Sequence, residues 1–419
     1  MGKYRIKQRY IDDFLVLLMF CISGNPAFVS TVPLGKFVYG LMLLVILAVS
    51  GFKIKREALK QSAIWIILLA VIFGCQFLLL GQITVLGSLN LIVKLLCAIL
   101  LASYMGHRLP DTAIRVMSGI CLVSLVFYLI NLTGVRFESP LDIDMKSKSL
   151  IIYTQTWEEP YKDTLFRSSG MFWEPGAFAG YIIATWLLFV DQPRALWKKH
   201  KVSFLIMSVS LLTTTSTTGY ITFAIFLLYF LIRENRKGYG KWIAYGVALI
   251  LLLGAIFAFT RIDFLGQKIQ REILASENLT ESDVNDSRIG SFIFDLQYIF
   301  SHPVFGNGLS DQTRYRFHLG RYDKESLDGL GNGFSGCIAS MGLLFMLSYL
   351  MAIGFNRTLR AWWMVVLMVI LLLQGEYYLN YPWFMMFPFL NFGSVRESPA
   401  RKRKIRFVWN KTQENESLS

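Results

Sequence analysis

Apolar runs recur along almost the whole chain, and each is close to the roughly 20 residues that a helix needs to span a bilayer core. Hydrophobic residues make up 54% of the 419 residues, and charged residues only 17%. A typical soluble domain carries about 25% charge. No Pro/Gly/Ser-rich linker divides the chain into soluble domains. These features exclude a disordered chain, a disulfide scaffold and an ordinary cytosolic enzyme. They predict an all-α, polytopic helical membrane protein.

The apolar runs predict about twelve transmembrane helices. Segment 203–232 is too short for two full spans and has the polar run TTTSTTG at its middle, so it forms either one long tilted helix or a hairpin of two short helices. The expected spans are 11–31, 34–51, 62–80, 87–105, 113–134, 172–190, 203–214, 217–232, 242–260, 335–354, 361–375 and 379–393.

Clusters of Lys and Arg lie between the apolar runs, and cytoplasmic loops carry such an excess. A hairpin at 203–232 places every cluster on one side of the membrane, whereas a single helix there breaks the alternation. We therefore expect the hairpin and both termini in the cytoplasm. The net charge of +14 then reflects membrane topology and does not indicate binding of nucleic acid. The clusters are at 3–9, 53–60, 108–115, 194–201, 233–241, 357–360 and 401–406.

Two long segments, 135–171 and 261–334, fall on the opposite side and together hold 13 Lys/Arg and 17 Asp/Glu. The run SRIGSFIFDLQYIF in the second has helical apolar spacing and predicts an amphipathic helix at the interface. The expected organisation is therefore five spans in 1–134, an outer loop at 135–171, four spans in 172–260, an outer loop at 261–334, three spans in 335–393 and a basic tail at 394–419.

Two parts of the membrane region carry candidate site residues. A lysine within a span is costly, so Lys94 either reaches the outer headgroups or faces a cavity that takes an anion. In FRSSGMFWEPGAFAGYI, Arg167 can grip a phosphate or carboxylate, and Trp173 and Glu174 precede a span. Glu174 also suits a helix start, where the dipole favours a negative charge.

The second outer loop and the turn at 376 carry the other candidates. Arg288 opens the amphipathic helix, and Arg314 and Arg316 form a basic group that could equally be ordinary loop surface. His302 and His318 are the external histidines, and histidine is the usual base near neutral pH. Glu376, in QGEYYLNYPWF, could face the same cavity as Lys94. No residue set suits a dedicated metal site, so no metal is expected.

The order of these motifs resembles a known family. FRSSGMFWEPGAFAGYI, LLTTTSTTGYITF and SRIGSFIFDLQYIFSHPVFGNGLS followed by three spans look like the Wzy-type polymerases of bacterial O-antigen and capsular polysaccharide and the related O-antigen ligases. The resemblance covers roughly residues 85–390. It implies a GT-C-like fold in the bacterial cytoplasmic (inner) membrane and an inverting, metal-independent glycosyltransferase without a cofactor. The donor would be a polyprenyl-pyrophosphate-linked oligosaccharide, with membrane lipids, a chain-length regulator and a flippase as further partners.

Under this resemblance, Arg167, Arg288 and Lys94 would bind the pyrophosphate and stabilise the charge that grows on it. Glu174 or His318 would take the proton of the acceptor hydroxyl. The remaining contacts to pyrophosphate or glycan would come from Arg314, Arg316, Glu376 and Trp173. Two alternatives remain: an O-antigen ligase with lipid A core as acceptor, and a polytopic transporter or flippase of lipid-linked oligosaccharide.

Overall fold

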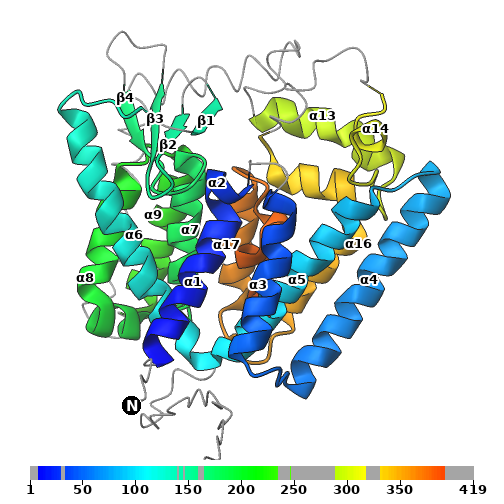
Figure 1. The fold of residues 1–419 in the computed structure, drawn as a ribbon, viewed down its shortest axis with the longest axis horizontal. Helices are drawn as coiled ribbons and strands as arrows, with labels where there is room; N and C mark the ends of the chain where they lie inside the picture. The colour runs from blue at the N-terminus through cyan, green and yellow to red at the C-terminus, as the bar shows by residue number, and fades with distance from the viewer. Residues whose placement is uncertain are drawn as a thin grey trace, which may run out of the picture.

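The computed structural model describes residues 8–29, 34–138, 141–144, 147–158, 165–234, 246, 288–317 and 331–391, and most of these are helical (Figure 1). The expected span 242–260 apart from residue 246, most of the loop 261–334 with His318, and the tail 394–419 lie outside the described residues. The first half contains α1 (Gln8–Gly24), α2 (Pro26–Val29), α3 (Leu34–Val49), α4 (Arg56–Leu80), α5 (Val85–Met105), η1 (Gly106–Arg108) and α6 (Leu109–Leu132). The second half contains α7 (Pro175–Leu187), α8 (Pro193–Leu212), α9 (Thr217–Glu234), α13 (Arg288–Ser301), α14 (Asp311–Arg314), α16 (Gly333–Gly354), α17 (Trp362–Leu373), η2 (Tyr378–Asn380), α18 (Pro382–Met385) and η3 (Phe387–Phe389).

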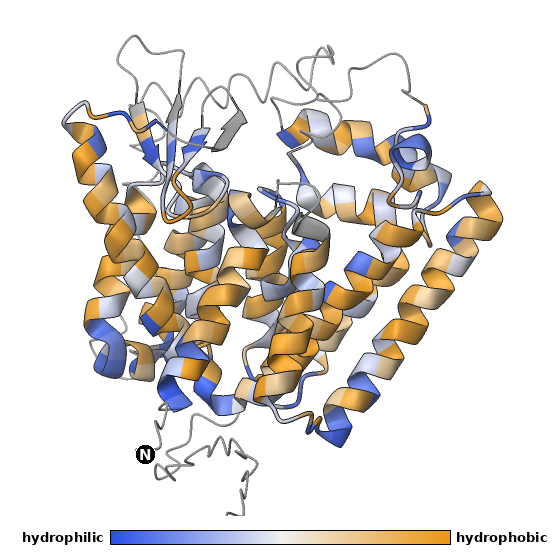
Figure 2. Cartoon of the chain, viewed as in Figure 1, coloured by the Kyte–Doolittle hydropathy of each residue, from blue (hydrophilic) through white to orange (hydrophobic). Residues whose placement is uncertain are grey.

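Three described helices are long and apolar enough to cross a membrane: Arg56–Leu80, Val85–Leu132 and Gly333–Gly354. The second is divided by η1 into α5 and α6, which diverge from a shared lower end (Figure 1). Apolar residues cover these helices, and hydrophilic residues lie mainly at their ends (Figure 2). On α4 the exposed side chains include Ile64, Ile67 and Leu78, which a lipid environment would cover. The chain thus has the features of a helical membrane protein.

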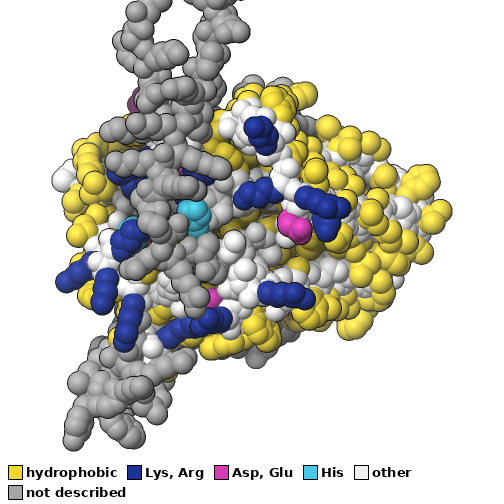
Figure 3. Space-filling model, turned by 90° about the horizontal axis from the view of Figure 1, so that it is seen from below, with side chains coloured by type: hydrophobic (Ala, Val, Ile, Leu, Met, Phe, Trp, Pro, Cys, Tyr) yellow, Lys and Arg dark blue, Asp and Glu magenta, His cyan; other side chains and the backbone are white. Residues whose placement is uncertain are grey.

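One end of the helical bundle is strongly basic. Seen from below, many Lys and Arg side chains gather on this face (Figure 3). Helices α1 and α4 begin at this end, where they carry Arg9 and Arg56. The opposite end carries strands and the helices α13 and α14 (Figure 1). The basic residues are therefore gathered at one end of the helical bundle, and the strands with α13 and α14 lie at the other end.

Residues 141–168 add a small sheet that an all-α prediction does not include. Strands β1 (Leu141–Asp144), β2 (Ser147–Ser149), β3 (Thr154–Glu158) and β4 (Leu165–Ser168) pair antiparallel in the order β1-β2-β3-β4. Several contacts of this sheet join two hydroxyls: Thr156 Oγ1 lies 2.6 Å from Ser169 Oγ, and Ser168 Oγ lies 2.6 Å from Ser124 Oγ on α6. Because the buried side chains are polar, the sequence shows no alternation of apolar residues that would reveal the strands.

Helices α8 and α9 are separate and meet at the turn 213–216, within the polar run at which the sequence places a hairpin tip. Helix α8 begins at Pro193, ahead of the expected start, and is kinked at His200. Helix α7 is only 13 residues long, shorter than the expected span 172–190, and nearly all of it is buried. A short helix of this kind is enclosed by its neighbours instead of facing lipid along its length.

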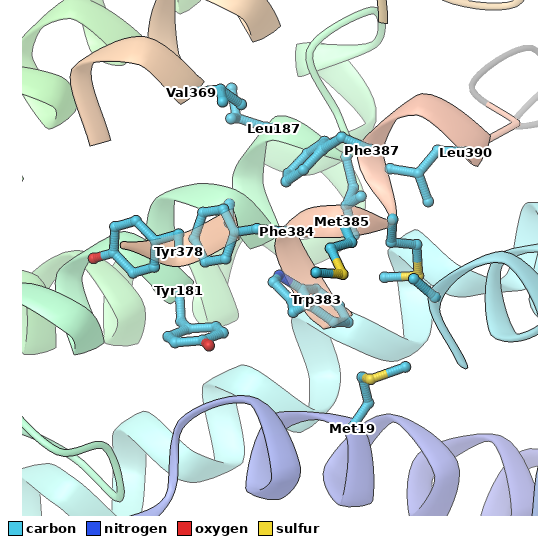
Figure 4. Packing of buried hydrophobic residues seen from close by; sticks show 14 of the residues in the cluster. Met19, Tyr181, Leu187, Val369, Tyr378, Trp383, Phe384, Met385, Phe387 and Leu390 are labelled. Atoms are coloured by element: carbon cyan, nitrogen blue, oxygen red, sulfur yellow. The ribbon is translucent and has the colours of Figure 1, made fainter. Parts of the chain in front are cut away.

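The expected span 379–393 is not one helix. It consists of η2, α18 and η3, and Pro382 and Pro388 interrupt regular helical hydrogen bonding between them. Trp383 and Phe384 of this segment are buried, and Figure 4 shows the segment packed against residues of α1, α7 and α17. Broken backbone is tolerated at this depth because it lies inside the protein.

A kink in α16 joins the turn after α13 to the helical bundle. Gly342 has φ +81°, and a Cβ there would lie 2.1 Å from the Val304 carbonyl oxygen, so only glycine fits. The amides of Leu343 and Leu344, freed by the kink, donate to the carbonyls of Pro303 (2.8 Å) and Val304 (3.1 Å). Gln76 of α4 donates to the Ser340 carbonyl (2.9 Å) beside them. The HPVFGNG turn after α13 is thus built into the helix bundle.

Candidate functional site

Four side chains from three separate parts of the chain meet at the end of the bundle opposite the basic face. We call them the carboxyl–arginine cluster: Trp173, Glu174, Arg288 and Glu376. Trp173 Nε1 donates to Glu376 Oε2 at 3.3 Å. Arg288 Nη1 lies 3.5 Å from Glu376 Oε1 and also donates to the Gly331 carbonyl. The Glu376 side chain is 15% exposed and the Arg288 side chain 36% exposed, so the cluster is open to solvent on the side of Arg288.

The two carboxyl groups of the cluster lie together over the start of α7. A Cβ on Gly176 would be 2.6 Å from Glu174 Oε1 and 3.9 Å from Glu376 Oε1. Burial, followed by the nearby Glu174 carboxyl, raises the pKa of Glu376 well above its ordinary value. Arg288 and Trp173 act on the pKa in the opposite direction.

Local sequence explains why these side chains converge. Glu174 is the N-cap residue of α7, followed by Pro175, but its side chain makes no capping hydrogen bond. The Glu174 carboxylate therefore does not cap the helix. Tyr378 donates to the Gly176 carbonyl at 2.8 Å, and a Cβ on Gly180 would lie only 2.0 Å from its hydroxyl oxygen. The glycines of α7 thus bring the segment after α17 against the helix.

Asn332 connects α13, which carries Arg288, to the chain just before Glu376. Its side-chain amide donates to Gln374 Oε1 (2.9 Å) just after α17 and to the Arg288 carbonyl (3.5 Å) at the start of α13. Its oxygen accepts from the Ser335 amide (3.1 Å) as the N-cap of α16. One side chain therefore connects the ends of α13, α16 and α17.

Lys94 of α5 adds a buried cation beside the cluster. Its side chain is 6% exposed and lies inside the protein instead of reaching toward the headgroups. Its Nζ donates to Asn380 Oδ1 at 3.0 Å and lies 4.8 Å and 5.8 Å from the ring centres of Tyr39 and Tyr381. The Tyr381 ring lies 4.9 Å from the Trp173 ring, which connects Lys94 to the cluster. Lys94 makes no ion pair with any carboxylate among the described residues.

Asn90 lies one turn before Lys94, on the same face of α5. Its Oδ1 is buried and has no hydrogen-bond partner among the described residues. A buried ammonium can donate three hydrogen bonds, and Lys94 uses one of them within the protein. An unpaired buried acceptor is costly, so this face of α5 is suited to a polar ligand that donates to Asn90 and accepts from Lys94.

Arg167 contacts a different part of the protein. It lies on β4, and its Nε donates to Thr215 Oγ1 (2.7 Å) and to the Thr214 carbonyl (3.1 Å) in the turn between α8 and α9. Thr215 has φ +47°, a strained conformation that these bonds help to hold. Arg167 thus supports the hairpin tip, and an anion site that it would share with Arg288 stays a prediction.

The basic group of the second outer loop is divided by the structure. Arg314 is buried, pairs with Asp295, and lies over the rings of Tyr298 and Tyr315 (5.1 Å and 4.9 Å). Its contacts are those of a structural ion pair. Arg316 is exposed, with Nη2 3.3 Å from His302 Nδ1.

His302 is also 3.0 Å from Asn307 Oδ1, so it belongs to the turn after α13. His318 lies outside the described residues. Neither histidine therefore adds a described contact to the carboxyl–arginine cluster.

Sequence reasoning missed the residues that connect the site. Tyr378, Asn380 and Tyr381 fall in a run of aromatic residues that reads as an interfacial belt, yet Tyr378 is buried against α7. The signal was the polar Asn380 within an otherwise apolar run. Within the described residues, no three His, Cys, Asp or Glu side chains are grouped to hold a metal ion.

Comparison with known proteins gives no relative: no family model, curated protein or solved structure matches the chain. The chemistry of the site is therefore argued from its own geometry.

Proposed function

We propose that this protein is a membrane glycosyltransferase. It polymerises polyprenyl-pyrophosphate-linked oligosaccharide units into O-antigen or capsular polysaccharide on the outer face of the bacterial cytoplasmic membrane. Twelve spans with both termini in the cytoplasm belong to the same proposal. The observation that carries it is the carboxyl–arginine cluster with Lys94 beside it, at the end of the bundle away from the basic face.

The cations of the site suit a pyrophosphate leaving group. Lys94 has no carboxylate partner among the described residues, and Arg288 is 36% exposed at the start of α13. A preorganised donor aimed at developing negative charge contributes about 3 kcal/mol to transition-state stabilisation. Lys94 comes from α5 of the bundle and Arg288 from the start of α13, and in this proposal both cations contact the lipid-linked pyrophosphate.

The carboxyl groups and rings suit the acceptor. A base is needed to take the proton of the acceptor hydroxyl, and Glu174 and Glu376 are the acidic groups of the cluster. Trp173 and Tyr381 provide flat apolar surfaces beside them. The cations for the leaving group and the carboxyl groups that can act as the base thus belong to neighbouring parts of one site, as glycosyl transfer requires.

A transporter or flippase is the second candidate, because one observation favours it. The segment 378–389 is a broken helix inside the bundle, next to a buried lysine, and transporters build their substrate sites in this way. A proton-coupled transporter would also use carboxyl groups in this place, so the experiment below separates the two candidates.

The test is a gel of lipid-linked and surface glycan from a deletion strain. The strain is complemented with wild type, Arg288→Gln, or Arg357→Gln as a control whose arginine is exposed between α16 and α17. The polymerase predicts that wild type and the control restore a ladder, whereas Arg288→Gln leaves a core with one repeat. Long chains left on the carrier with bare core would indicate the ligase. Lipid-linked units retained on the cytoplasmic side would indicate the flippase, and an unchanged ladder in the deletion strain would refute all three.

A further inference from the structure

The carboxyl pair is built from two distant parts of the chain. Glu174 ends the loop before α7, and Glu376 follows α17, yet both carboxyl groups lie beside Gly176: a Cβ there would be 2.6 Å from Glu174 Oε1 and 3.9 Å from Glu376 Oε1. Two ionised carboxylates this close repel each other, and one proton held between them relieves the repulsion.

The contacts around the pair fix one carboxyl and leave the other adaptable. Trp173 Nε1 donates to Glu376 Oε2, and Arg288 lies beside Glu376 Oε1. Both oxygens of Glu376 are therefore oriented by groups that favour its charged form. The Glu174 side chain makes no capping bond to α7 and can turn toward a ligand.

We propose that Glu174 and Glu376 share one proton as a carboxyl pair and together act as the base that accepts the proton of the acceptor hydroxyl. This inference rests on the proposed function. In the step, the acceptor O–H bond breaks and its proton passes to the ionised member of the pair. The acceptor oxygen attacks the anomeric carbon of the donor. The bond from that carbon to the pyrophosphate oxygen breaks, and the pyrophosphate leaves with the electron pair.

Every charged or titratable group that faces the pair acts on its protonation. Arg288 from α13 is the cation in contact with it, and it favours the ionised form. Tyr378 and Tyr381 come from the segment after α17. Lys94 lies one ring further away, beyond Tyr381. Among the described residues Arg288 is the one cation in contact with these two half-buried carboxyl groups, so the pair can keep one proton, which agrees with the raised pKa of Glu376.

The first measurement is made on the protein alone. Infrared spectra of the full-length protein in nanodiscs are compared between wild type and three variants, Glu174→Gln, Glu376→Gln and Glu57→Gln. Glu57 is the control, an exposed glutamate at the start of α4. Shared protonation predicts a protonated-carboxyl band at neutral pH that both cluster variants lose, because the amide of Gln donates to the remaining carboxylate. The control keeps the band. Absence of the band from wild type overturns the pairing without any need for a folded variant.

The second measurement is polymer formation from polyprenyl-pyrophosphate-linked repeat units in the same nanodiscs. A base of this kind contributes about 100-fold to 10,000-fold to the rate, so each cluster variant is expected to lose that much while Glu57→Gln keeps wild-type activity. If wild type polymerises and either cluster variant matches it, the pair is not the base. If wild type shows the band and makes no polymer, the proposed function fails, and the role given to the pair fails with it.

Discussion

The buried ion pair between Asp295 and Arg314 gives the sharpest stability prediction. Asp295 is fully buried in α13, contacts Arg314 and accepts from Ser335 Oγ of α16 at 2.6 Å. Asp295→Asn removes the negative charge and leaves a buried guanidinium uncompensated. Removing one partner of a buried pair costs about 3–5 kcal/mol. At 1.36 kcal/mol per factor of ten, α13 would open about 100-fold to 5,000-fold more often.

Hydrogen exchange of the α13 amides in detergent or nanodiscs measures this opening directly. The matched control is Asp311→Asn, an exposed aspartate in the same segment, which should change exchange by less than about twofold. The double variant Asp295→Leu with Arg314→Met should recover most of the protection, since it removes both charges. Ser335 can then donate to the Asn332 carbonyl, 3.4 Å away. A change of less than about fivefold in Asp295→Asn would refute the view that this pair joins α13 to α16.

Three further predictions concern the site. Gly180→Ala should destabilise the protein by about 2 kcal/mol or more in thermal unfolding, because the new Cβ would lie 2.0 Å from the Tyr378 hydroxyl. The control is Gly119→Ala, which has open space around it and should be neutral or stabilising by up to about 1 kcal/mol. Lys94→Met should keep or raise the apparent Tm, since it removes a buried charge that has no carboxylate partner among the described residues. The same variant should lower polymer formation about 100-fold. A lower Tm would mean that Lys94 is a structural residue. The raised pKa of Glu376 means that the folded state holds the proton more tightly, so its contribution to stability is present at low pH and is lost as pH rises through the raised pKa. The apparent Tm should therefore fall as pH rises above about pH 5, and Glu376→Gln should flatten that dependence.

Several site residues could be recognised from sequence because their chemistry is unusual for their place. Lys94 stands within an apolar run, and Trp173, Glu174, Arg288 and Glu376 stand beside helix ends. The structure brings these five together. The sequence could not exclude other polar residues of the same loops, because a charge at a helix end looks the same whether it faces a site or solvent. Arg167 illustrates this, since its guanidinium holds the turn between α8 and α9.

The roles of the other basic residues were decided by packing. Arg314 and Arg316 are two positions apart and look equivalent in the sequence, yet one is buried against Asp295 and the other is exposed beside His302. The four short strands also escaped detection because the buried hydroxyls of Ser and Thr give no hydrophobic period.

The sequence by itself determined that the chain is helical and apolar enough to enter a membrane, because apolar run length is a local property that bilayer thickness tests directly. It also determined the segregation of basic clusters, which follows from the order of residues alone. Only the tertiary structure decided that the last apolar run is broken into η2, α18 and η3, and that Glu174 meets Glu376 about 200 positions along the chain. These outcomes depend on which helices pack together, and that is set by side-chain shape across contacts that no single segment contains.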